Sequence, residues 1–208
     1  MKLRQSRSRQ TRDQILGAAR ELFSRQGYEP TSIDQVASAA KVAKSSVFAH
    51  FGDKANLLAA LGLGDIEKLA EAGKAEVARA DDRPLAEQLR ALLQPWLSYF
   101  CREHAFAGLY LSQSALTRGP HTEAFLDLCW VLEDQVAELF RKSHKGSLPA
   151  ERAQLLARGV QALFHEVIVF EISGWIVSPD SAEIMLDRFL DIWIAGAQQT
   201  ASPPDTIA

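Results

Sequence analysis

Apolar residues recur along the chain at the spacing of amphipathic helices. Between Thr11 and Gln26 they fall at offsets 0, 3, 4, 7 and 8, the stripe that one face of a helix presents: Ile15, Ala18, Ala19, Leu22 and Phe23. No segment shows the alternation expected of a strand. The same spacing predicts an all-α chain with helices over 11–26, 32–40, 44–50, a longer one from residue 54, 84–101, 104–116, 121–144, 149–173 and 180–198.

Helix-end signals support several of these boundaries. Gly27 suits the left-handed residue that closes a helix, and Ser32 with Gln35 has the spacing of a capping box. Asp53 is placed to cap the helix from Lys54, and the glycines at 62 and 64 predict a kink or an early end there. The tail over 201–208, with two adjacent prolines, is expected to be disordered.

The distribution of charge is more informative than its sum. The 208 residues are 47% hydrophobic and 24% charged, which is ordinary for a globular protein, and the net charge is −3. Residues 1–56 carry ten Lys and Arg against five Asp and Glu, whereas 57–208 carry thirteen against twenty-one. A basic N-terminal segment on an acidic remainder points to nucleic acid or another anionic surface.

Several function classes lack the residues they need. The basic start of the chain has no apolar stretch behind it, and no run of 18 apolar residues follows, so we expect neither export nor a membrane partner. Two cysteines, Cys101 and Cys129, suggest a reduced, cytoplasmic protein. His165-Glu166 is half of a zinc-protease motif, and Cys101 with His104 supplies too few ligands for zinc. We expect no enzyme, metal or cofactor.

The two short helices after Pro30 have the layout of a helix-turn-helix. Their apolar positions can form a small core with the preceding helix: Ile33, Val36, Ala37, Val42, Val47 and Phe51. Lys44, Ser45, Phe48 and Ala49 then face outward, where they can meet base edges or a thymine methyl group in the major groove. Hydroxyl, imidazole and ammonium groups at helix ends are placed to meet phosphates: Thr31, Ser46, His50 and Lys54. The alternative is an ordinary three-helix core with solvated lysines.

Residues 2–9 carry four basic side chains but no helical apolar stripe. We expect a flexible arm that follows phosphates or enters the minor groove, or a solvated tail.

The run over 31–37 (TSIDQVA), then 42–54 (VAKSSVFAHFGDK) and Leu57, resembles the TetR (tetracycline-repressor) family of transcriptional regulators. The resemblance covers about residues 11–58 and implies a DNA-binding domain over 1–56 and a ligand-binding and dimerisation domain over 57–200. Together with the spacing it predicts these DNA-contacting residues: Thr31, Ser32, Lys41, Lys44, Ser45, Ser46, Phe48, Ala49, His50 and Lys54.

Two residues depart from the family pattern. Lys41 stands at the usual turn glycine, which costs about 1 kcal/mol if its φ is positive. Ala43 replaces the Ser or Thr that caps the second helix, a loss of about 1 kcal/mol.

The last two predicted helices are apolar on nearly every side, and a second subunit would bury them. The family resemblance implies the same dimer, with an interface formed by Leu163, Val167, Phe170, Met185, Phe189 and Trp193. The alternative is a thick monomeric core.

Aromatic residues concentrate between residues 96 and 130. They suit a mostly apolar cavity with a few polar groups, although plain core explains each of them as well. The resemblance implies an effector site among these helices, with these candidates: Trp96, Phe100, His104, Phe106, Tyr110, Gln113, Trp130, Phe164 and His165.

The function expected is a homodimeric repressor that a small apolar or amphipathic effector releases from a palindromic operator on double-stranded DNA. The alternatives are an activator, a DNA-binding dimer without a ligand, and a helical enzyme or lipid carrier with a vestigial head.

Overall fold

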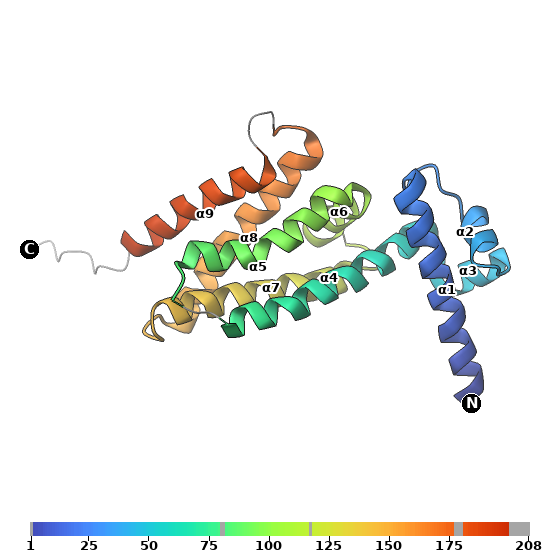
Figure 1. Cartoon of the computed structure of the whole chain (residues 1–208), viewed down its shortest axis with the longest axis horizontal. Coiled ribbons are helices and arrows are strands. Elements are labelled where there is room, and N and C mark those ends of the chain that lie inside the picture. The colour runs from blue at the N-terminus through green and yellow to red at the C-terminus, as the bar shows by residue number, and fades with distance from the viewer. Residues whose placement is uncertain (1, 80–81, 117, 177–180, 200–208) are drawn as a thin grey trace, which may run out of the picture. The chain divides into compact units, whose positions relative to one another are not determined.

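The computed structural model describes residues 2–79, 82–116, 118–176 and 181–199, and of residues 2–5, 115–116 and 198–199 it describes the backbone alone (Figure 1). Throughout these ranges the secondary structure is helical, with no strand, which confirms the predicted all-α fold. The elements are α1 (Lys2–Gln26), α2 (Ile33–Ala39), α3 (Lys44–Phe51), α4 (Lys54–Arg79), α5 (Leu85–Arg102), α6 (His104–Leu111), the π-helical segment η1 (Ser112–Leu116), α7 (Thr122–Ser143), α8 (Ala150–Ser173) and α9 (Ala182–Gln199).

The chain forms two compact units, residues 1–65 and 66–208, which we call the head and the body. The head extends beyond residue 56 because the first turns of α4 belong to its core. Leu57 and Leu61 pack with the predicted core residues of α2 and α3, and the α1 stripe completes the cluster with Ile15 and Leu22. The proposed tail over 201–208 lies outside the described residues.

Three helix boundaries differ from the expectations. α1 begins at Lys2, so the basic arm is helical rather than flexible along its described backbone. Nothing in 2–26 breaks a helix, and extending an existing helix is easier than nucleating one. α4 runs without interruption past residues 62–64, so the early end predicted from the glycines was wrong. The predicted helix over 104–116 changes to π-helical geometry from Ser112.

The helix caps follow the sequence signals. Gly27 has a φ of +87°, which favours glycine, and its N–H donates to the Phe23 carbonyl. Ser32 and Gln35 form the complete capping box. Asp53 Oδ1 accepts a hydrogen bond from the Asn56 N–H at 2.7 Å, as expected of a cap on α4.

The turn between α2 and α3 carries both departures from the family pattern. Lys41 has a φ of +55°, the left-handed conformation that costs a non-glycine residue about 1 kcal/mol. Ala43 is the extended N-cap of α3 and makes no side-chain hydrogen bond to the helix. The turn keeps its geometry through backbone bonds, in which the N–H groups of Lys41 and Val42 donate to the Ser38 and Ala37 carbonyls.

The body is a bundle in which α8 contacts α5, α6, α7 and α9, and α9 also contacts α5 (Figure 1). α9 buries one stripe, Leu186, Leu190 and Ile194, against these neighbours. Arg90 on α5 binds Asp187 and Asp191 on α9 at 2.7 and 2.8 Å.

Gly159 permits a close approach between α8 and α9. A Cβ there would lie 2.0 Å from Cζ2 of Trp193, so only glycine leaves room for the indole. Trp193 Nε1 then donates to the Leu156 carbonyl at 3.1 Å.

Restoring the missing cap should stabilise the protein. Ala43→Ser places a hydroxyl at the N-cap, where it can accept from an N–H group in the first turn of α3, and we expect the free energy of unfolding of the head to rise by about 1 kcal/mol. Urea denaturation followed by circular dichroism measures the change. Ser32→Ala at the cap of α2 is the matched opposite and should lose about the same amount. Equal stability of Ala43→Ser and the unmodified protein would show that α3 gains nothing from a cap.

Candidate nucleic-acid interface and cavities of the body

The inward packing of α3 determines which of its side chains face outward. Val47 and Phe51 are buried in the head, so Lys44, Ser45, Phe48 and Ala49 lie on the opposite side, and all four are exposed. Phe48 is 45% exposed despite its apolar ring. The structure thus brings together the four outward residues that the sequence predicted, and none of these four side chains is acidic.

A carboxylate accompanies the basic group on this face. Lys44 Nζ lies 2.9 Å from Oδ2 of Asp34, which stands in the first turn of α2, and both side chains are exposed. Exposed pairs of this kind contribute little to stability, because water screens both charges. The ammonium is therefore available to exchange the carboxylate for a phosphate. Sequence reasoning missed Asp34, since its proximity to Lys44 depends on the angle between α2 and α3.

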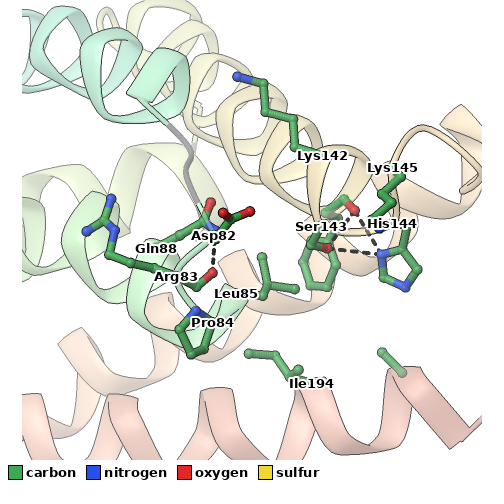
Figure 2. A pocket seen from close by; sticks show the side chains of 12 residues that line it. Asp82, Arg83, Pro84, Leu85, Gln88, Lys142, Ser143, His144, Lys145 and Ile194 are labelled. Atoms are coloured by element: carbon green, nitrogen blue, oxygen red, sulfur yellow. Dashed lines mark hydrogen bonds between the residues drawn. The ribbon is translucent and has the colours of Figure 1, made fainter.

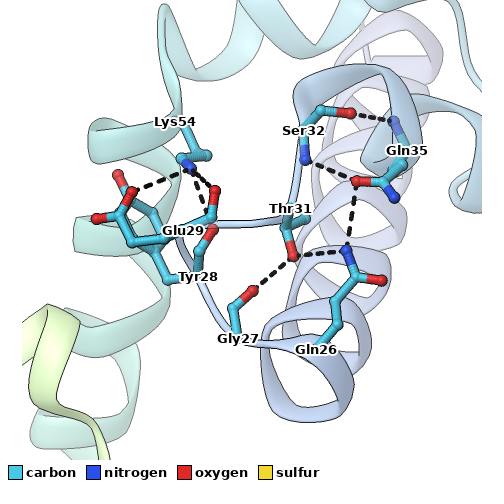
Figure 3. A network of polar contacts seen from close by, with 8 residues as sticks. All are labelled: Gln26, Gly27, Tyr28, Glu29, Thr31, Ser32, Gln35 and Lys54. Atoms are coloured by element: carbon cyan, nitrogen blue, oxygen red, sulfur yellow. Dashed lines mark hydrogen bonds and ion pairs between the residues drawn. The ribbon is translucent and has the colours of Figure 1, made fainter.

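The loop before α2 is held by a polar network (Figure 3). Thr31 is 1% exposed, its hydroxyl donates to the Gly27 carbonyl at 2.7 Å, and it accepts from Gln26 Nε2 at 3.1 Å. Gln26 also donates to Gln35 Oε1, which links α1 to the capping box. Thr31 is thus a buried structural residue and does not reach the surface as predicted.

Lys54 fixes the other end of this loop. Its ammonium donates to the carbonyls of Tyr28 and Glu29 at 3.0 and 3.1 Å and lies 4.2 Å from the centre of the Tyr28 ring (Figure 3). The two carbonyl oxygens and the electron-rich face of the ring both attract the positive charge of the ammonium group. Lys54 therefore positions the loop rather than projecting from it, and burial with the nearby Glu29 and Asp53 carboxylates raises the pKa of Tyr28.

The remaining predicted contacts surround the outward face of α3. Lys41 and Ser32 are exposed, and Ser46 and His50 are half-buried. Ser32 already accepts the N–H of Gln35 with its hydroxyl. The residues predicted to contact DNA that remain exposed or half-buried around this face are Lys41, Lys44, Ser45, Ser46, Phe48, Ala49 and His50, with Ser32 at its edge.

The predicted effector residues separate into two groups in the body. Most of the aromatic side chains are buried and in contact with one another. The centre of the Phe100 ring lies 4.8 Å from that of Tyr110 and 6.0 Å from that of Phe106. These four predicted residues are buried among the helices of the body, and their contact with an effector stays a prediction: Trp96, Phe100, Phe106 and Phe164. His104 is exposed, and Gln113 accepts the His121 N–H at 3.1 Å.

Trp130 and His165 line a different space, a cavity of about 290 Å³ between α7, α8 and η1. Tyr110, in the core, connects two of the residues that line it. Its hydroxyl lies 2.6 Å from His165 Nε2 and 3.0 Å from Cys129 Sγ, so three polar groups form a buried chain. Burial lowers the pKa of His165 to about 4 and raises that of Tyr110, and the pKa of the Cys129 thiol is also raised by burial. All three groups are therefore neutral at pH 7.

A larger cavity of about 560 Å³ lies where the start of α5 and the end of α7 face α9 (Figure 2). Three of its basic groups are already engaged. Arg83 binds Glu76 at 2.6 Å, Lys142 Nζ donates to the Val77 carbonyl at 2.6 Å, and His144 Nδ1 lies 2.9 Å from the Phe140 carbonyl. These contacts close the end of the bundle.

α8 and α9 bury apolar side chains on the side that faces the body but leave others exposed on the opposite side. Leu155 and Ile192 are 64% and 72% exposed, and they line a shallow apolar depression of about 420 Å³ with Leu156 and Trp193. Val167, in contrast, is fully buried within the chain and cannot form part of a subunit contact. The other predicted interface residues are half-buried: Leu163, Phe170, Met185, Phe189 and Trp193.

Among the described residues no three His, Cys, Asp or Glu side chains converge as metal ligands would. No helix within the described ranges is long and apolar enough to cross a membrane. Cys101 and Cys129 are free thiols.

A helix-turn-helix with an exposed second helix defines a class of DNA-binding proteins, and comparison with known proteins specifies the family. Residues 15–61 match the model of bacterial regulatory proteins of the tetR family. A transcriptional repressor, AcnR, from Corynebacterium diphtheriae is 35% identical over 143 residues, which cover 66% of this chain and 67% of that protein. The chain belongs to the TetR family.

Other relatives match the chain in part or in fold. The regulator TcmR from Streptomyces glaucescens is 41% identical over 85 residues, and AcnR from Corynebacterium glutamicum is 32% identical over 84. The chain spans 36% and 41% of the length of these two relatives. The structure of the repressor FadR from Thermus thermophilus, solved with lauroyl-CoA, has a TM-score of 0.66 at 20% identity and covers 95% of this chain and 98% of that one.

The buried imidazole should make stability depend on pH. The unfolded chain protonates His165 near pH 6.5 but the folded chain only near pH 4, so stability is lost as pH falls between these values. We expect the wild type to lose about 2 kcal/mol more than His165→Gln between pH 7 and pH 4.5. Urea denaturation at both values measures this difference.

His104→Gln is the matched control, because water surrounds that exposed ring before and after unfolding. It should follow the wild type at both pH values. If His165→Gln also follows the wild type, His165 is not held neutral by the fold.

Proposed function

We propose that the chain is a homodimeric transcriptional repressor whose α3 helix reads the major groove and whose body binds a small effector. The observation that carries the proposal is the exposed face of α3, where Lys44, Ser45, Phe48 and Ala49 lie beside one another on the second helix of a helix-turn-helix. The C. diphtheriae relative, which matches two thirds of this chain, is named a repressor.

Each residue of this face has a plausible partner on DNA by its chemistry. Lys44 can bind a guanine edge or a phosphate, and Ser45 can hydrogen-bond to either. Phe48 and Ala49 suit a thymine methyl group, a contact that would bury the exposed ring of Phe48. Lys41 adds a charge at the turn, where the phosphate backbone passes.

The dimer is inferred from the unpartnered side of α8 and α9. Leu155 and Ile192 are exposed on adjacent helices, and a twofold contact through the depression between them would cover both in each subunit. Two heads would then bind successive major grooves about 34 Å apart, which requires a palindromic operator.

Release by an effector requires that the ligand bind the two conformations with different affinities. α4 is continuous from the head core at Leu57 to Arg79 in the body, so it is the covalent route by which a change in the body reaches the head. The proposal assigns no catalytic step to the chain and places it in the cytoplasm, where bacterial DNA is found.

The charge pair on the head gives a direct test of DNA binding. Lys44→Ala should weaken binding about tenfold and reduce the salt dependence by about one phosphate contact. Asp34→Asn should strengthen binding, because it removes the carboxylate that competes with phosphate for Lys44. Fluorescence anisotropy with a duplex enriched from a random-sequence library, titrated at several salt concentrations, measures both.

Lys74→Ala is the matched control, since Lys74 is an exposed lysine of the body that pairs with Glu71 at 2.5 Å. It should bind DNA as the wild type does. If Lys44→Ala and Lys74→Ala behave alike, α3 is not the reading helix.

The exposed apolar side chains test the dimer. Ile192→Arg with Leu155→Arg should convert the dimer to a monomer in sedimentation experiments, because four guanidinium groups would be buried without partners in the contact. Trp130→Arg, which also replaces an exposed large apolar side chain, should leave the dimer intact. A double variant that stays dimeric would place the interface elsewhere.

A further inference from the structure

The cavity between α7, α8 and η1 has features that plain core does not explain. Its apolar wall is formed by Leu126, Trp130 and Ala162, and Ser114, Cys129 and His165 supply polar atoms. The volume of about 290 Å³ lies at the lower end of ligand cavities in proteins, roughly 300–1,000 Å³. A bicyclic molecule fits such a space, but a long acyl chain with its headgroup does not.

Ser114 is the first sign that a ligand completes this cavity. Its hydroxyl is buried and has no hydrogen-bond partner among the described residues. A buried polar group without a partner costs about 1–3 kcal/mol, and most such groups in proteins are satisfied. Ser114 belongs to the π-helical segment η1, which follows α6, and π-helical geometry is frequent at functional sites. A polar atom of a ligand would recover this cost.

The chain of three polar groups adds a second hydrogen-bonding site. Tyr110 can donate its proton to His165 Nε2 while it accepts from the Cys129 thiol, which leaves a proton on His165 Nδ1. In the reverse arrangement His165 Nε2 donates and Nδ1 becomes an acceptor. The same residues can therefore serve either a donor or an acceptor on a ligand, without any charge in the cavity.

The charged residues at the cavity disfavour an ionised ligand. Glu133 is buried, and its carboxylate binds Arg158 at 3.0 Å. The guanidinium lies 5.7 Å from the centre of the Trp130 ring, and both side chains are exposed. An anionic ligand would meet the Glu133 carboxylate and would find Arg158, the one cation among the described lining residues, already paired, whereas a cationic ligand would meet Arg158. A neutral molecule is neither attracted nor repelled by the paired charges of Glu133 and Arg158.

From these contacts we propose that the cavity is the effector site and that its ligand is a compact, uncharged, largely apolar molecule with one hydroxyl or carbonyl group. The apolar body lies against Leu126, Trp130 and Ala162, and its polar group bonds to Ser114 and His165. The assignment rests on the proposed function only in calling the ligand an effector.

Three naphthalene probes of similar size test separately the apolar contact, the hydrogen bond and the preference for a neutral ligand. 2-Naphthol is neutral at pH 7 and carries one hydroxyl, naphthalene carries none, and 2-naphthoate is an anion. Calorimetric titration of the full-length protein should give the tightest binding for 2-naphthol, about tenfold weaker binding for naphthalene, and no binding for 2-naphthoate. Tightest binding of the anion, or no binding of any probe, would overturn the proposal.

Variants then locate the bound probe. Ser114→Ala should weaken 2-naphthol about tenfold and leave naphthalene unchanged, because only the hydroxyl loses a partner. Ala162→Trp should abolish binding by filling the cavity, and the exposed position of Ala162 on α8 lets the fold accept the larger side chain. Ala72→Trp, at an exposed position of α4, is the matched control and should bind as the wild type. Unchanged 2-naphthol binding in Ser114→Ala or Ala162→Trp would place the probe elsewhere.

DNA binding of the same proteins separates this proposal from the proposed function. Without a probe, Ala162→Trp should bind the enriched duplex as the wild type does, and 2-naphthol should weaken the wild type alone. If DNA binding is normal but no probe affects it, the effector assignment fails and the DNA-binding function stands. If 2-naphthol binds the cavity but no variant binds DNA specifically, the repressor proposal fails and the ligand site remains.

Discussion

The inward orientation of Val47 and Phe51 is the constraint on which the candidate DNA interface depends. Both side chains are buried in the core that α1, α2 and the first turns of α4 share. Helical positions repeat every 3.6 residues. Because Val47 and Phe51 point inward, the other side of α3 faces outward, and it carries Lys44, Ser45, Phe48 and Ala49. A small core therefore holds the outward face of α3 in one orientation.

The polar contacts of the head hold the elements that surround this core. Lys54 binds the loop before α2 through two carbonyls and the Tyr28 ring, and Arg20 binds Asp65 with two hydrogen bonds of 2.6 and 2.9 Å. Thr31 and the capping box fix the start of α2. These polar groups hold the helices of the head in place, and the exposed side chains of α3 remain accessible to a DNA partner.

Local signals predicted the elements well. Apart from the start of α1, the apolar spacing placed the helix boundaries that it predicted within a few residues. The cap at Ser32, the closing Gly27 and the departures at Lys41 and Ala43 have the predicted conformations. The exposure of α3 followed from the same spacing. Errors arose at the basic arm and at the glycines of α4, where continuity of a helix outweighed local preference.

Residue roles that depend on tertiary contacts were not readable from the sequence. Thr31 has the composition of a phosphate contact, but the loop folds its hydroxyl inward. The aromatic residues of α5 and α6 have the composition of a pocket wall, and only the structure shows how closely their rings pack against one another. Nothing in the sequence singled out Ser114. Its burial without a hydrogen-bond partner depends on how α7 and α8 pack around it, which only the structure shows.

The central claim is that two copies of α3 enter the major groove of one duplex. Methylation protection at guanine N7, an atom exposed in the major groove, tests it most directly on a duplex enriched by the full-length protein. Two protected patches related by twofold symmetry, with centres about 10 base pairs apart or a multiple of that spacing, are the expected result. A single patch, or a bound duplex whose guanine N7 atoms all react as in free DNA, would contradict a dimer that reads DNA through α3.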